Sequence, residues 1–327
     1  MNAVLYGSNS PIDVVVGIDN FTFELKAGQP FGGIKNISPG IHVLHWGDDS
    51  MRYGYWFDVK NQYQIVYRER FELVPNTSIE YQQEVASHLQ FMVTYPREGP
   101  WGELSRYVSL EQAQMITGDS RAYADSSMTS LEESQMLQRT LSQGSMDIPN
   151  SDPVFHFHTI KFKSLEAIRE DHKAEDFMDK SYYLNQVLLP EHYGNHFDRL
   201  LGELQFAFLN VMVFGNYGSS LQWHSIVELI SFSSRVNKDT IRRFDGILSL
   251  QIDNLQQEYA DFLLNPSVWF RVLNDSHQGH NLSLTRRTFS NRGPDLLEDA
   301  GQDANDPDQY SDEYEPTVVG GVYYCRQ

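Results

Sequence analysis

Histidine is the residue type in this sequence that is best suited to metal binding or acid–base chemistry, and six of the eleven histidines form close pairs. The pairs are His42 with His45, His156 with His158, and His277 with His280. Alternate side chains of a strand share one face, so the pair at positions 156 and 158 could bind zinc from one side. No pair has a nearby thiolate or a carboxylate at ligand spacing. The favoured interpretation is therefore structural histidines and no metal.

Sequence motifs for catalysis are missing. The chain has no Gly-x-Ser-x-Gly elbow, no phosphate-binding loop and no His-Glu-x-x-His helix. The single cysteine, Cys325, has no base fixed beside it, which argues against a nucleophilic role. The glycine pair Gly320-Gly321 is not followed by a helix, so it does not form a phosphate cradle. We predict a protein that is not an enzyme and that uses no cofactor.

A serine-rich segment carries the clearest signal for regulation. Ser231, Ser233 and Ser234 lie close to Arg235 and Lys238. A phosphate there would add about −1.5 to −2 charges, and it could cap the following helix or disrupt a docked partner. We therefore predict a phosphorylation switch, with Ser233 as the preferred site of the three. The alternative is a serine-rich helix cap and connector without regulation.

The C-terminal segment gives the sharpest functional clue. Residues 295–315 contain nine acidic residues and no lysine or arginine, which is typical of a solvated tether. Strong strand formers follow after Pro316. A strand on a tether either returns to its own sheet or adds to the sheet of a partner. The predicted partner-binding residues are Thr317, Val318, Val319, Val322, Tyr323 and Tyr324.

Composition and charge limit the possible partners. The chain has 327 residues, 40% of them hydrophobic, and a net charge of −19. This charge repels nucleic-acid phosphates, so a basic protein is a more natural partner than RNA. One cysteine fits a reducing compartment, and neither a signal peptide nor a membrane-spanning segment is evident. We expect a soluble intracellular protein that contacts no membrane.

The first part of the chain, residues 1–125, reads as an antiparallel β-sandwich domain. Short runs rich in aromatic and β-branched residues alternate with glycine, proline and aspartate turn signals between residues 12 and 100. A further strand is predicted over 91–95 and one helix over 101–116. The aromatic run 53–57 is interpreted as core packing, with an exposed platform for a glycan or peptide as the alternative.

Residues 126–162 read as a polar linker with a returning strand. A surface helix is predicted over 132–141, and 142–153 has almost no apolar residues. The alternating stretch 156–162 is predicted to rejoin the first domain as a strand. Such a linker would let two folded domains adjust relative to each other.

Residues 163–290 read as a helical domain, followed by the acidic tail 291–327. The stretch 203–230 predicts two apolar helices joined at 215–218, with Ser219 or Ser220 capping the second helix. Asp239 is predicted to cap the next helix, and Pro266 to begin another. Several short-looped helices favour a bundle or a right-handed solenoid.

Six segments, at 17–23, 30–35, 51–57, 125–129, 179–184 and 203–230, stand out as distinctive and occur in one order along the chain. Together they resemble the a1-cistron splicing factor family, and the sequence is identified as a fungal member of it. None of the segments is a catalytic motif. The resemblance implies that the helical domain is a solenoid similar to the VHS domains of trafficking adaptors.

The resemblance also implies a function. The family's proteins are non-enzymatic chaperones of U5 snRNP assembly, present in cytoplasm and nucleus. They bind the RNase H-like and MPN-like domains of the large U5 scaffold protein and exclude the U5 helicase until a phosphorylation-linked release. The alternative is a VHS-like trafficking adaptor that reads acidic peptides, for which Lys238, Arg242 and Arg243 are the candidate basic residues.

Overall fold

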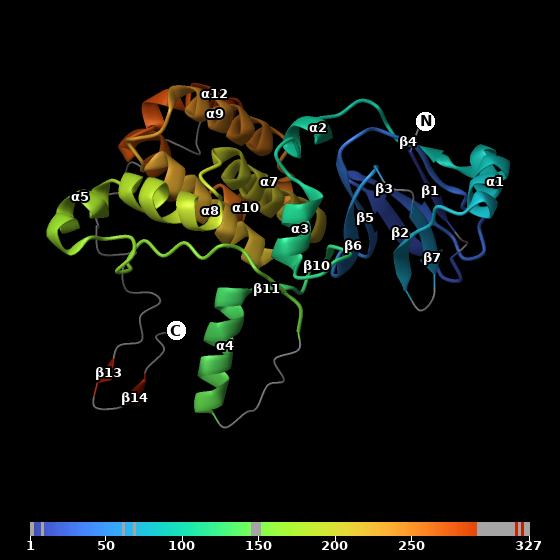
Figure 1. The fold of residues 1–327 in the computed structure, drawn as a ribbon, viewed down its shortest axis with the longest axis horizontal. Helices are drawn as coiled ribbons and strands as arrows, with labels where there is room; N and C mark the ends of the chain where they lie inside the picture. Colours follow the sequence, from blue (N-terminus) through green and yellow to red (C-terminus); the bar gives the residue numbers. More distant parts are fainter. Residues whose placement is uncertain are drawn as a thin grey trace.

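The computed structural model describes residues 3–7, 10–60, 63–67, 70–144 and 152–292, together with 318–319 and 322–323. Two β-sheets gather at one end of the molecule, and helices α5 to α12 gather at the other (Figure 1). The predicted α+β class, with an N-terminal sheet region and a C-terminal helical region, is confirmed.

One sheet is fully antiparallel, with strand order β10-β6-β5-β2-β3. Its strands are β2 (Val14–Ile18), β3 (Phe21–Leu25), β5 (Ile41–Gly47), β6 (Arg52–Asp58) and β10 (Tyr123–Asp125). The β-branched and aromatic residues of these segments favour the extended conformation. Consecutive residues in the middle of β5 and β6 are buried, so the centre of this sheet is covered on both faces.

The other sheet is mixed, with strand order β8-β7-β1-β4-β9. Its strands are β1 (Ala3–Gly7), β4 (Gly33–Ile37), β7 (Tyr63–Tyr67), β8 (Phe71–Pro75) and β9 (Val93–Thr94). The pairs β1–β7 and β4–β9 are parallel. The prediction of a purely antiparallel sandwich is therefore wrong for this sheet, because both parallel pairs join strands distant in sequence. Side chains from both sheets, such as Ile34, Tyr55 and Ile65, fill one core between them.

Local structure after β8 differs from two sequence predictions. Helix α1 (Ile79–His88) follows β8 and leads into a 3₁₀ turn, η1 (Leu89–Phe91). In place of the predicted strand over 91–95, this turn is followed by the two-residue strand β9. The predicted helix over 101–116 is two helices, α2 (Trp101–Leu104) and α3 (Leu110–Thr117). The break occurs because the side chain of Ser109 caps a new helix by accepting from the Gln112 amide.

After β10, the predicted surface helix is confirmed, but the predicted returning strand is not. Helix α4 (Leu131–Gln143) begins with a capping box and projects from the body (Figure 1). The paired strands flanking it are β11 (Thr129–Ser130) and β12 (Val154–Phe155). The predicted strand over 156–162 is wrong, because its amides bond elsewhere: the His156 amide donates to Ile116 O and the His158 amide donates to the Glu203 carboxylate. Residues 145–151 of the predicted linker lie outside the described residues.

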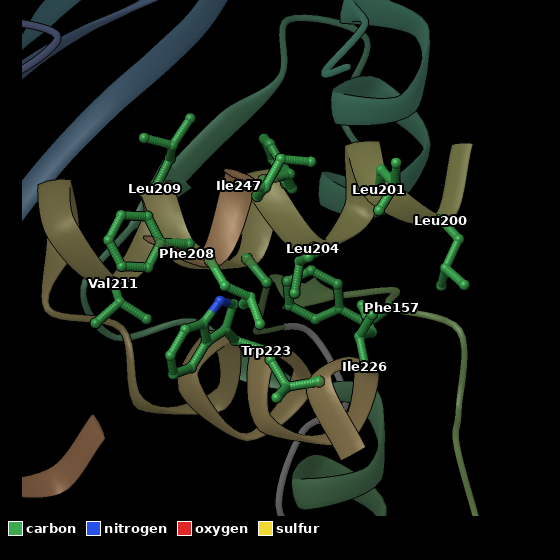
Figure 2. Close-up of a cluster of buried hydrophobic side chains, with 14 of the residues drawn as sticks. Phe157, Leu200, Leu201, Leu204, Phe208, Leu209, Val211, Trp223, Ile226 and Ile247 are labelled. Atoms are coloured by element: carbon green, nitrogen blue, oxygen red, sulfur yellow. The ribbon is translucent and has the colours of Figure 1, made fainter. Parts of the chain in front are cut away.

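The helical region is built around α7 (Phe197–Phe214) and α8 (Tyr217–Ser231), which pack through the buried side chains shown in Figure 2. Gly215 ends α7 with a φ of 61°, as the sequence predicted. The caps differ from prediction: Asn216, not a serine, caps α8, and Asn237, not Asp239, caps α9. The other elements are η2 (Glu170–His172), α5 (Lys173–Met178), η3 (Tyr183–Leu188), α6 (Leu189–His192), α9 (Lys238–Asp253), α10 (Gln257–Leu263), α11 (Pro266–Phe270), η4 (Arg271–Asp275), η5 (Gly279–Asn281) and α12 (Ser283–Arg292).

Pro266 begins α11, as predicted. The more specific prediction of a VHS-like right-handed solenoid stays a prediction.

The antiparallel sheet and the helices share one hydrophobic core, and a second core lies between the two sheets. The ring centroid of Trp56, on β6, lies 5.0 Å from that of Phe206 on α7, and the Trp56 indole donates to Asn210 at 3.3 Å. Gly54 also lies in a tight space, since an added Cβ would lie 2.5 Å from Leu44 O and 3.0 Å from the ring of Phe214 on α7. Ile41 and Val43 of β5 belong to the same core. The idea that the sandwich and the helices adjust freely through a flexible linker does not agree with this packing, and the boundaries predicted at 125 and 162 stay predictions.

Two short tail strands, β13 (Val318–Val319) and β14 (Val322–Tyr323), pair with each other in antiparallel fashion. The prediction of one continuous strand over 317–324 is not confirmed, because the sequence between the two strands is Gly320-Gly321. Thr317 and Tyr324 lie outside the described residues. Partner binding by the tail residues stays a prediction.

Because the core is shared, we expect sheets and helices to unfold in one transition. Phe206→Ala should lower the free energy of unfolding by about 3–5 kcal/mol and keep the transition single. Leu165→Ala, at a side chain 98% exposed, should change it by less than about 0.5 kcal/mol. Urea titrations followed by far-UV and near-UV circular dichroism check this. Two separated transitions in the unsubstituted protein would contradict a shared core.

Candidate protein-binding site

The predicted serine segment forms the connection between α8 and α9, and a single carboxylate organises it. Asp179 Oδ1 accepts from the Ser181 amide at 2.9 Å, the Ser181 hydroxyl at 2.6 Å and the Ser234 amide at 3.1 Å. Its Oδ2 accepts from the Ser234 hydroxyl. Partial burial raises the pKa of Asp179, but these donors lower it more, to about 2. The carboxylate therefore stays ionised at neutral pH and holds the connection in place.

The three predicted serines occupy very different environments. Ser231 is the last residue of α8 and is buried. Ser233 is also buried, and its hydroxyl donates to the Leu229 carbonyl at 2.7 Å. Ser234 is exposed. The preference for Ser233 as the modified residue does not agree with its burial, because a kinase needs access to the hydroxyl; Ser234 is the accessible serine.

Backbone contacts fix the same connection from two other sides. The Lys180 amide donates to Phe232 O at 2.9 Å, and the Arg235 amide donates to the Ser181 hydroxyl at 2.9 Å. The side-chain amide of Gln278 donates to Ser233 O at 2.7 Å. The connection is therefore an ordered surface element.

Two large apolar side chains lie beside this connection. Phe177 and Met178, at the end of α5, are 56% and 65% exposed and directly precede Asp179. Arg235 reaches back towards α5, with its guanidinium 3.5 Å from Glu175. We call the surface made by Phe177, Met178, Ser234 and Arg235 the switch surface. Large apolar side chains that are exposed next to one another are a candidate contact for a protein partner.

The histidine pairs have structural roles where the structure describes their contacts. His42 Nδ1 lies 2.6 Å from the buried Asp19 carboxylate, which also accepts from Tyr95 OH at 2.6 Å. His45 Nε2 bonds the Asp19 carbonyl at 2.8 Å. His277 Nε2 lies 3.2 Å from the Met178 carbonyl. Within the described ranges no three His, Cys, Asp or Glu side chains gather where they could hold a metal ion.

A second buried carboxylate, Glu203 on α7, was not predicted as a site. It accepts from His158 Nδ1 at 2.7 Å, Gln222 Nε2 at 2.9 Å and Tyr193 OH at 3.1 Å. Burial lowers the pKa of His158, but the hydrogen bond and charge of Glu203 raise it above its ordinary value. In the sequence, the one sign of this contact is Glu203 itself, an acidic residue within an apolar helix pattern. It anchors the segment after β12 onto the helices.

None of the described helices is both long and apolar enough to cross a membrane. The fold and the switch surface together define an α+β protein with an apolar surface beside a hydrogen-bonded serine connection. Models of two protein domains match the sequence: the AAR2 N-terminal domain over residues 1–118 and the AAR2 C-terminal repeat region over residues 157–299.

Relatives match in the same way. The chain is 40% identical to "A1 cistron-splicing factor AAR2" of Saccharomyces cerevisiae, over the full length of both chains. It is 25% identical to "Protein AAR2 homolog" of Homo sapiens and of Mus musculus, covering 79% of this chain and 76% of each relative. The chain belongs to the AAR2 family. The family resemblance inferred from the sequence is thereby confirmed.

The pKa of His45 predicts acid sensitivity. Burial, followed by the nearby Arg52 charge, lowers this pKa to about 3, whereas an unfolded histidine titrates near 6.5. Below about pH 6.5 the unfolded chain gains a proton on His45 that the folded protein does not bind. The contribution of neutral, buried His45 to stability is therefore full above about pH 6.5 and is lost as the pH falls towards the folded pKa. Between pH 7 and pH 5 the free energy of unfolding should fall by about 2 kcal/mol from this residue.

Urea denaturation of the protein and of His45→Gln across pH 5.0–7.5 measures this effect. The variant should be less stable at pH 7.5 but should show a shallower pH dependence. His172→Gln, which removes an exposed histidine, is the matched control and should keep the parent slope. Equal slopes for His45→Gln and the parent would show that His45 is not the source.

Proposed function

We propose that this chain acts in pre-mRNA splicing as a non-enzymatic assembly chaperone of the U5 snRNP. Its partner is the large U5 scaffold protein, bound through the RNase H-like and MPN-like domains in the cytoplasm and nucleus. The observation that carries the proposal is the end-to-end match, at 40% identity, to a relative named as a splicing factor. While bound, the chain keeps the U5 helicase off the scaffold.

The shared core supports a fixed spacing between two docking faces. Trp56 and Phe206 join the sheets to the helices, so a partner domain on each part would be held in one relative orientation. A rigid two-faced support suits a chaperone that must hold two domains of one scaffold. It also lowers the entropy cost of the second contact, because the two faces are already in place.

The acidic tail supplies a third contact in this proposal. Residues 295–315 act as a tether, and the strands at Val318–Val319 and Val322–Tyr323 add to an open sheet edge of the scaffold. The pairing of β13 with β14 means that the tail binds either as a hairpin or after opening. The negative tether favours a partner with a basic surface.

Release in this proposal begins at Ser234 on the switch surface. A phosphate on its oxygen would face the ionised Asp179 carboxylate, which now accepts a hydrogen bond from that oxygen. Replacing this bond by repulsion between two anions would displace the connection between α8 and α9. A partner seated on Phe177 and Met178 would lose part of its binding surface.

The trafficking-adaptor alternative is not favoured. If the chain were a trafficking adaptor, we would expect its relatives to be sorting adaptors. Instead, a relative that aligns over the full chain is named as a splicing factor. Lys238 and Arg242 do line a common pocket, but Arg243 instead bonds Asp198 on α7. The proposed basic groove is thus divided between two surfaces.

Removing the tail should weaken scaffold binding. A chain ending at Asp303 should bind a purified scaffold fragment that contains both domains at least about tenfold more weakly, measured by calorimetry. The full chain with alanine at Val318, Val319, Val322 and Tyr323 is the matched control, because it keeps the acidic tether. If the full chain and the chain ending at Asp303 bind the fragment with equal affinity, binding lies on the folded parts alone. If the full chain does not bind the fragment, the proposed function is wrong.

Phosphoserine at position 234 should also weaken this complex, by about tenfold or more, because it removes a serine contact and repels Asp179. Phosphoserine at the exposed position 290 on α12 should leave the affinity within about twofold. Asp179→Asn should recover part of the lost affinity, since it removes the repelling charge. Unchanged affinity with phosphoserine 234 would refute release through this residue.

A further inference from the structure

A pocket of about 540 Å³ lies next to the switch surface, at the beginning of two helices. Helices α9 and α12 lie side by side and run in the same direction. This is shown by two bonded pairs in the same order along both helices, Asp245 with Thr285 and then Ser249 with Thr288. Their first residues, Lys238 and Ser283, both line the pocket. Helix beginnings carry partial positive charge, so this concavity favours an anion.

The side chains of the pocket add to that preference. Lys238 and Arg242 line it, and both are exposed. Arg242 pairs with Asp239 at 2.7 Å, but these side chains are 77% and 78% exposed, so the pair is weak and exchangeable. The acidic lining residue, Asp245, is buried and already accepts from the amides of Leu284 and Thr285. Two cations are therefore available to a ligand.

The same pocket borders the connection that carries Ser234. Gln278 lines the pocket, and its side-chain amide donates to Ser233 O at 2.7 Å and to Ser234 O at 3.4 Å. Val236, two residues after Ser234, is also part of the lining. Ser234 thus contacts Asp179 through its hydroxyl and the pocket residue Gln278 through its carbonyl.

We propose that this pocket is the receptor for the phosphoryl group of phosphorylated Ser234, which leaves Asp179 and binds Lys238 and Arg242. The inference rests on the proposed modification of Ser234 and adds the place where the phosphate goes. The connection between α8 and α9 then has two alternative positions. In one it is held by Asp179 and presents the switch surface; in the other it is held by the pocket.

Charge decides between the two positions. The unmodified hydroxyl is a donor and fits the ionised Asp179. The phosphate carries about −1.5 to −2 charges and only accepts hydrogen bonds at neutral pH, so Asp179 and Glu175 repel it. Ammonium and guanidinium groups form charge-assisted hydrogen bonds with phosphate oxygens. A competing cation is Arg235, which follows Ser234 in the sequence and lies 3.5 Å from Glu175.

Phosphorus NMR of the full chain with phosphoserine at position 234 tests this assignment without any partner. Cations beside a phosphate lower its second pKa, which is near about 6 in an exposed peptide. We expect that pKa to be lower, by at least about half a unit, than in the same protein carrying Lys238→Gln and Arg242→Gln. Arg287→Gln, an exposed charge on α12, is the matched control and should leave the phosphate titration unchanged.

Two results would overturn the assignment. One is an identical phosphate titration with and without the Lys238 and Arg242 substitutions, in chains whose urea unfolding shows that they are folded. The other is loss of the lowered pKa on Arg235→Gln alone, which would place the phosphate on Arg235. A lowered pKa combined with unchanged scaffold affinity would support the receptor and refute only the proposed release, so the two failures are distinguishable.

Discussion

The packing of Trp56 against Phe206 is the contact on which the rest of the structure depends. Successive side chains of β6 point to opposite faces of its sheet, so Tyr55 and Phe57 fill the core between the sheets while Trp56 enters the helical core. One strand therefore belongs to two cores at once. Its indole also donates to Asn210 on α7, which fixes the orientation of the ring. Sheets and helices are joined through the interior of the protein, in addition to the chain connection.

Three buried or partly buried carboxylates organise the segments between these elements. Asp19 orders the beginning of β5 through the Val43 amide and His42, Glu203 anchors the segment after β12, and Asp179 holds the connection after α8. Each accepts three or more hydrogen bonds, which offsets the cost of removing its charge from water. Each also joins residues far apart in sequence: Asp19 bonds Tyr95, Glu203 bonds His158, and Asp179 bonds Ser234.

The sequence predicted those features that depend on neighbouring residues. The periodic apolar residues of 203–230 and the glycine at 215 suffice to predict two helices and the end of α7, although α7 begins earlier, at Phe197, and α8 is capped by Asn216. The aromatic run 53–57 likewise identified β6 and its two buried faces. In each case the signal lies within a few turns of the chain, where periodicity and turn chemistry are informative.

What could not be predicted depends on distant pairings. The parallel pairing of β1 with β7 makes the second sheet mixed, and no local pattern distinguishes it from an antiparallel neighbour. The serine segment does lie at the end of α8, as predicted, but Asp179, which determines the environment of Ser234, lies 55 residues away. Burial of Ser233 follows from the path of α8 into its connection, which the composition of the segment does not reveal.

The core shared by the antiparallel sheet and the helices limits which parts of the molecule can move. Moving the sheets relative to the helices would expose Trp56 and Phe206, which together bury several hundred Å² of aromatic surface. Displacing the connection between α8 and α9 breaks only the hydrogen bonds around Asp179 and leaves that core intact. A rearrangement of this connection therefore costs less than a movement of the sheets against the helices. Of the three serines, Ser234 alone is exposed, while Ser231 and Ser233 are buried.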